Sequence, residues 1–171
     1  WGWWFTGTDV NGERAHAVLR ELKGVDDAQV QLQARHCVWA IDFYLGKHNN
    51  CITCVEEALP LYEPIQTRSH QFGGHDAKVC GLAHRGLSLW FRGKVSDALS
   101  DVKAAKALAG ERKHVGSIAH ALGNHAILSC YRRDFEALRA DIAELRQLTE
   151  KNRLPALAAT ALIYEGWCEG A

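Results

Sequence analysis

The sequence predicts an all-α fold, an α-solenoid in which antiparallel helix pairs stack on one another. Three observations predict it. Apolar residues recur at three- and four-residue steps through most of the chain, as on one face of an amphipathic helix. Turn residues at Gly7, Gly46, Gly93 and Arg133 interrupt this pattern about every 40 residues, the length of one helix pair in a helical repeat. No segment alternates between β-branched and polar residues as a half-buried strand does.

The central hairpin, Leu82–Leu108, shows this pattern most clearly, with a tight turn at Arg92–Lys94. The apolar stripes of its two helices comprise Leu82, Gly86, Leu89 and Trp90, and then Ala98, Leu99, Val102, Ala105 and Leu108. Gly86 and Ala98 fall where the helices would cross, and small residues there let the two backbones approach closely. One hairpin cannot bury its own stripe, so it must stack on others like it.

Helix boundaries follow from capping and turn residues. The expected N-caps are Thr8 or Asp9, Asp26 or Asp27, Asp76 and Asp134, and the expected C-terminal stops include Gly24 and Gly110. We expect helices over Val10–Leu22, from Asp26 or Asp27 to about Leu45, over Cys51–Tyr62, in the central hairpin, and over Val115–Arg132, Phe135–Glu150 and Pro155–Glu169. Glu63–Gly74 is the longest irregular stretch, and loops of that length are often functional.

These helices form a single domain, residues 1–171. Its hairpins are expected at about 1–24, 26–62, 76–110 and 113–151, followed by a last helix at 155–169. The chain contains no methionine and begins WGWWF. We interpret it as a fragment of a longer protein, with these tryptophans at the end of an upstream helix pair. The alternative is that modified methionines are missing from the sequence. An apolar end at Trp1–Phe5 also predicts a homo-oligomer.

The composition argues against several classes of function. Twenty basic residues balance twenty acidic ones, so the chain lacks the positive charge that nucleic acids and anionic lipids attract. No apolar run reaches the roughly 18 residues of a membrane-spanning helix, and no secretory signal pattern opens the chain. The six cysteines are scattered through predicted helices, which favours free, buried thiols and a cytoplasmic location over a disulfide framework.

Each hairpin resembles a tetratricopeptide repeat. The central hairpin matches that motif at Leu82, Gly86, Leu89, Gly93, Ala98, Val102 and Ala105. The second matches it at Gly46, Val55 and Ala58, with Cys51 in place of the usual Ala, and the fourth has Arg133 and Leu138 in place of the turn Gly and the small residue. The resemblance implies a right-handed superhelix whose concave surface is lined by the first helix of each hairpin.

A narrower resemblance is to the C-terminal repeats of large bacterial signalling ATPases. The segments that carry it are Leu61–Pro64, GGHD, VCGLAHRGLSLWFRG, Tyr131–Asp134 and Tyr164–Trp167. This chain has Asp76-Ala77 where that family usually has Asp-Pro. Such repeats follow a P-loop ATPase module, itself attached to a class III nucleotide cyclase or a winged-helix DNA-binding domain.

This resemblance implies a non-catalytic interaction and regulatory scaffold of a cytoplasmic signalling or transcription-regulating ATPase. Its partner would be a protein, a peptide or other domains of the parent chain. The chain itself has no GxxxxGK loop followed by Ser or Thr, so we expect no cofactor here and no enzymatic activity in this fragment.

Mapping the repeat motif onto the first helices gives a set of groove candidates. They are His36, Phe43, Tyr44, Leu87, Trp90, His120, Ile127 and Tyr131. Aromatic and histidine side chains suit a peptide or a small apolar ligand, so a small-molecule sensor is an alternative function. Phe43 and Trp90 have a second interpretation, as core residues packed between adjacent repeats.

A metal-dependent hydrolase is the second alternative. Its candidate ligands are His70, His75, Cys80 and His84, since imidazole and thiolate groups suit zinc. Histidines scattered through a chain also pair by chance, so we expect no bound metal. We expect Asp76 to cap a helix, and the CxxC pair Cys51 and Cys54 to fill core positions. No GxSxG elbow positions a catalytic serine.

Overall fold

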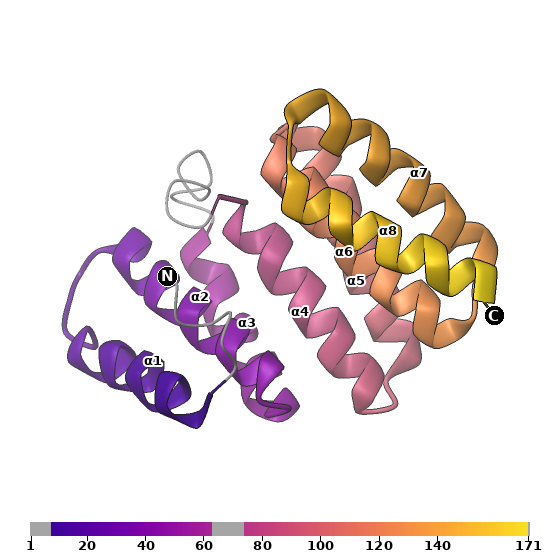
Figure 1. Ribbon diagram of the computed structural model, residues 1–171. Helices are drawn as coiled ribbons and strands as arrows, with labels where there is room; N and C mark the ends of the chain where they lie inside the picture. Colours follow the sequence, from indigo (N-terminus) through magenta and orange to yellow (C-terminus); the bar gives the residue numbers. More distant parts are fainter. Residues whose placement is uncertain (1–7, 63–73, 171) are drawn as a thin grey trace.

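A computed structural model describes residues 8–62 and 74–170, and these residues form eight helices (Figure 1). The helices are α1 (Asp9–Glu21), α2 (Ala28–Tyr44), α3 (His48–Tyr62), α4 (Ala77–Phe91), α5 (Val95–Arg112), α6 (Val115–Arg132), α7 (Phe135–Asn152) and α8 (Pro155–Gly170). None of the residues in these two ranges lies in a strand, and the predicted all-α class is confirmed. The expected apolar end at Trp1–Phe5 lies outside the described residues, as does His70.

The helices pack as sequential antiparallel pairs, from α1 at one end of the molecule to α7 and α8 at the other (Figure 1). Each helix contacts its neighbours in sequence, and α2 also contacts α4, α4 contacts α6, and α6 contacts α8. Among the described helices, α1, α3, α5 and α7 do not contact one another. The even-numbered helices therefore form one continuous layer, and each odd-numbered helix covers part of it.

Aspartate side chains cap three of the helices as the sequence predicts. Asp27 accepts hydrogen bonds from the backbone N–H groups at the start of α2, and Asp76 does the same for α4, at 2.8–3.1 Å. Asp134 accepts from the N–H of Ala137 in α7 at 3.2 Å. Thr8 occupies the N-cap position of α1, but its side chain makes no capping hydrogen bond.

The C-terminal ends of the helices differ from the prediction at Gly110. The helix α5 continues through Gly110 to Arg112, and Lys113 ends it in the left-handed conformation with φ 53°. Arg133 and Arg153 end α6 and α7 in the same way, whereas Gly93 takes this conformation after α4. The left-handed conformation is unfavourable for residues other than glycine. At these positions the basic side chain offsets part of that cost, because its charge interacts favourably with the C-terminal end of the helix dipole. The helix α3 also begins at His48, three residues before the predicted start.

The crossing of α4 and α5 depends on a glycine. A Cβ atom at Gly86 would lie 2.6 Å from Val102 Cγ2 and 3.1 Å from the carbonyl oxygen of Ala98. Beside this contact, Arg85 donates two hydrogen bonds to the carboxylate of Asp101, at 2.6 and 2.8 Å. The predicted close approach at Gly86 and Ala98 is confirmed.

Apolar side chains fill the spaces between the two helices of a pair. Trp39 and Val55 are buried between α2 and α3, and Leu122 and Leu138 between α6 and α7. All six cysteines are free thiols, and Cys51, Cys54 and Cys80 are buried. Among the described residues, no helix combines the length and the apolar composition that a bilayer crossing requires.

We predict that Gly86→Ala lowers the free energy of unfolding. Overpacking against the stiff side chain of Val102 costs about 1–3 kcal/mol, while the better helix propensity of alanine returns about 1 kcal/mol. The matched control is Gly110→Ala on α5, where a Cβ atom would meet nothing within 4 Å. This control should raise the free energy of unfolding by about 0.5–1 kcal/mol. Urea denaturation measures both, and equal stabilisation by the two substitutions would contradict the packing argument.

Candidate functional site

A pocket of about 490 Å³ opens in the layer of even-numbered helices. Most of its wall is apolar, with contributions from Ala40, Val115, Leu154 and Leu157. The side chains in the wall that carry ionisable groups are Tyr44 from α2, His75 from the segment before α4, Cys80 and His84 from α4, and His120 from α6. The pocket therefore combines a largely apolar wall with a few convergent polar groups, as small-ligand sites do.

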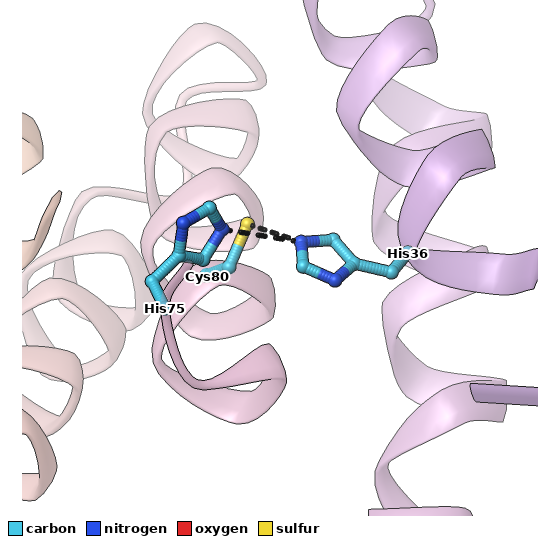
Figure 2. Close-up of side chains that lie close together, drawn as sticks. All are labelled: His36, His75 and Cys80. Atoms are coloured by element: carbon cyan, nitrogen blue, oxygen red, sulfur yellow. Dashed lines mark hydrogen bonds between the residues drawn. The ribbon is translucent and has the colours of Figure 1, made fainter. Parts of the chain in front are cut away.

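Four histidines and one cysteine meet beside this pocket, and all of them except His36 line it. Figure 2 shows His36 reaching from α2 toward His75 and Cys80 at the start of α4. The Nε2 atom of His36 lies 3.1 Å from Cys80 Sγ and 3.3 Å from His75 Nε2. Cys80 Sγ also lies 3.2 Å from His84 Nδ1. Cys80, His84 and His120 each offer one ligand atom, and these three atoms lie within 4.8 Å of one another. We name these five residues the histidine–cysteine cluster.

The backbone at His75 is held against two helices, α3 and α6. Its neighbour Asp76 accepts a hydrogen bond from the Tyr62 hydroxyl at 2.7 Å, and the Asp76 N–H donates to Ser117 Oγ at 2.7 Å. Gly74 has φ 69°, and its carbonyl oxygen lies so close to α6 that a Cβ atom at Gly116 would overlap it. The two glycines thus let this segment lie directly on the first turn of α6.

The cluster is buried, and burial keeps its members uncharged. His36, Cys80 and His84 expose 0%, 1% and 3% of their surface. Burial lowers the pKa of His84 to about 3 and that of His75 to about 4. Burial, reinforced by the neighbouring imidazoles, also holds the pKa values of His36 and His120 well below 6.5. It raises the pKa of the Cys80 thiol, so at neutral pH the pocket contains neutral imidazoles and a protonated thiol.

Two nitrogen atoms of the cluster lack a partner among the described residues. His84 Nε2 and His120 Nε2 are buried and make no hydrogen bond there. Leaving a buried polar atom without a hydrogen bond costs about 1–3 kcal/mol, so native proteins rarely do so without a reason. Binding of a ligand in the pocket would supply the missing partner.

The structure combines two sets of residues that the sequence suggested separately. His75, Cys80 and His84, three of the four metal candidates, lie together, and the groove candidates His36 and His120 join them. The sequence did contain a signal for this arrangement. His36, Cys80 and His120 are spaced by about one repeat length, so they occupy similar positions on successive first helices.

Of the other groove candidates, Tyr44 lies at the same pocket and the rest lie elsewhere. Leu87 is fully buried, so its prediction as a groove residue was wrong: the crossing of α4 and α5 turns it into the core. Phe43 and Trp90 are partly buried and pack against the cluster of Leu87, Val102 and Leu128, in line with their second interpretation. Tyr44 lines the main pocket, whereas Ile127 and Tyr131 line a separate pocket of about 330 Å³ between α6 and α8.

Comparison with known proteins identifies one related sequence and no family. No protein-family model matches the chain, and no solved structure matches it. An uncharacterized protein of Rhizobium meliloti (strain 1021) is 36% identical over 173 residues. That match includes 99% of this chain but only 17% of the relative's length. The chain is therefore similar to one segment of a much larger bacterial protein.

We predict that Gly116→Ala destabilises the protein, because the new Cβ would push the Gly74–His75 backbone away from α6. Overpacking of this kind costs about 1–3 kcal/mol. Gly123→Ala on the same helix is the matched control, since a Cβ atom there would meet nothing within 4 Å. Urea denaturation should show a loss for Gly116→Ala and a small gain for Gly123→Ala. A gain for both would mean that the segment does not lie against α6.

Proposed function

We propose that this chain is a non-catalytic regulatory module of a larger bacterial protein, and that its pocket receives a small ligand as the signal. The observation that carries the proposal is the pocket itself, whose largely apolar wall includes two histidines with buried Nε2 atoms that have no partner in the described ranges. Its volume of about 490 Å³ suits a small molecule better than a folded partner.

The size of the related protein supports a modular role. The segment that matches this chain makes up 17% of the relative's length, so most of the relative lies outside the matching region. The resemblance of the repeats leads us to propose that the parent is a cytoplasmic signalling or transcription-regulating ATPase. In that setting, the partners of the module are other domains of the parent chain.

The packing of the helices supports a tetratricopeptide-like, right-handed superhelix as the finer description of the fold. The same kind of contact recurs along the chain, between α2 and α4, between α4 and α6, and between α6 and α8. In a stack of this kind each pair contacts only its neighbours. A ligand that contacts three successive first helices therefore favours one stacking arrangement over another, and this preference is what a regulatory module needs.

The hydrolase alternative has weaker support. Hydrolysis at a metal centre usually needs a positioned general base as well as the ion. The carboxylate next to the cluster in sequence, Asp76, instead accepts from the Lys78 and Val79 N–H groups and from the Tyr62 hydroxyl. It serves as a helix cap, as the sequence predicts.

A thermal-shift screen tests the sensor role. We predict that an organic compound which occupies the pocket raises stability by about 2.7 kcal/mol at 100 times its dissociation constant. For a chain of this size, that corresponds to a rise of about 5–10 °C in melting temperature. The screen is run with a chelator present, so that metal ions do not contribute.

Two exposed tyrosines provide the matched variants. Tyr44 lines the main pocket and Tyr131 the separate one, and both are about half exposed, so neither substitution should disturb the fold. Tyr44→Ala should weaken the shift, and Tyr131→Ala should leave it unchanged. A screen without any stabilising compound, or an equal effect of both variants, would argue against the pocket. In the full-length parent, the ligand should change hydrogen exchange outside the module, and unchanged exchange there would remove the regulatory role.

A further inference from the structure

We propose that His36, His75 and Cys80 of the histidine–cysteine cluster bind one transition-metal ion, Zn²⁺ or a similar borderline-soft divalent ion, and that this ion ties α2 to α4. The binding claim rests on the geometry of the cluster. Only its regulatory consequence rests on the proposed function.

The donor atoms select the class of metal. Imidazole nitrogen and thiolate sulfur suit zinc and related transition metals, whereas calcium and magnesium prefer oxygen ligands. Within the described residues, the two groups of candidate ligands contain histidines and Cys80 but no carboxylate. The cluster is therefore a site for a transition metal and not for calcium or magnesium.

The distances between the donor atoms fit a tetrahedral ion. Zinc lies about 2.0–2.1 Å from nitrogen and about 2.3 Å from sulfur, so two ligand atoms of a tetrahedral site are about 3.3–3.6 Å apart. His36 Nε2 lies 3.1 Å from Cys80 Sγ and 3.3 Å from His75 Nε2. For these two pairs, shifts of less than about 0.5 Å would reach the separations of a zinc site. The His75 and Cys80 ligand atoms lie within 4.8 Å of each other.

The environment of His36 orients its Nε2 atom toward the ion. Its Nδ1 atom lies 3.3 Å from Gln33 Oε1, an acceptor, so the proton belongs on Nδ1 and the lone pair on Nε2. The ring of Trp39 stacks on the imidazole at 4.7 Å, which fixes its plane. A second hydrogen bond of this kind is the usual companion of a metal-binding histidine.

His84 and His120 form a second group with Cys80, separate from His36 and His75. Their buried Nε2 atoms have no partner within the part of the chain that the structure describes. His36, His75 and Cys80 therefore hold the ion, and its fourth position stays open to a ligand from the pocket. The histidines are already neutral, so only the Cys80 thiol must release a proton, to solvent, when the metal–sulfur bond forms.

Metal binding would couple two helix pairs. The ligands come from α2 and from the start of α4, and these helices belong to successive pairs. An ion at this site therefore stabilises one stacking of the pairs, in addition to the apolar contacts between them. This places the ion at the position where the module would respond to a signal.

The experiment is a zinc titration of the untagged protein after treatment with a chelator, in competition with a metal-binding dye. We expect one Zn²⁺ per chain. Cys80→Ala and His36→Gln should each weaken binding at least about 100-fold, the upper range seen when a supporting residue of a metal site is removed. Cobalt substitution should give the visible absorption of a tetrahedral thiolate complex, and Cys80→Ala should abolish it.

Matched controls separate the cluster from the other thiols and histidines. Cys54→Ala removes another buried thiol, and His48→Gln removes a partly buried histidine on α3, so neither should change zinc affinity. Circular dichroism checks that each variant is folded. If His36→Gln does not fold, His75→Gln replaces it, because His75 is less buried.

Two results would overturn the metal site. One is a wild-type protein that binds no Zn²⁺ at micromolar concentrations, and the other is Cys80→Ala binding zinc as tightly as the wild type. A failed titration beside a successful organic-ligand screen removes the metal site and leaves the sensor role. Zinc binding without any change of hydrogen exchange in the parent leaves the metal site and removes the regulatory role.

Discussion

Each helix pair has an apolar stripe that it cannot bury alone, and the rest of the structure depends on this constraint. Leu87, Leu122 and Leu138 are fully buried only because neighbouring helices cover them. Burying one such side chain stabilises the fold by about 1.5–3 kcal/mol. The pairs therefore stack, and the stacking brings the even-numbered helices into one layer. Without that layer, α2, α4 and α6 would not share a pocket.

The histidine–cysteine cluster is one place where this stacking buries polar atoms without pairing all of them; among the described residues, Arg35 Nε and Ser129 Oγ are other such atoms. Elsewhere the buried carboxylates have partners: Asp42 contacts His16 at 3.0 Å, and Asp141 contacts Lys106 at 2.7 Å and also His125. In the cluster, two buried imidazole nitrogens have no partner among the described residues. Residues that reduce stability without a structural benefit are expected at functional sites, where binding of a ligand offsets their cost. The location of both imidazoles in the wall of one pocket supports assigning function to it.

The local features of the fold could be predicted from the sequence. The helical class and the caps at Asp27, Asp76 and Asp134 follow from patterns that span only a few residues. The glycine at the crossing of α4 and α5 also follows, since Gly86 and Ala98 belong to one hairpin. The end of α5 was predicted incorrectly at Gly110, because glycine weakens a helix by only about 1 kcal/mol and packing of the neighbouring turns outweighs that cost.

The sequence by itself determined the helices, their order and the three metal candidates His75, Cys80 and His84. Only the tertiary structure decided that His36 and His120 join them, that Leu87 lies in the core, and that an apolar pocket opens beside the cluster. The physical reason is distance along the chain. His36 and Cys80 are 44 residues apart, and their contact depends on how α2 stacks on α4. Periodicity within one helix predicts which face is apolar, but the rotation and the register between two helix pairs come from side-chain packing over the whole interface.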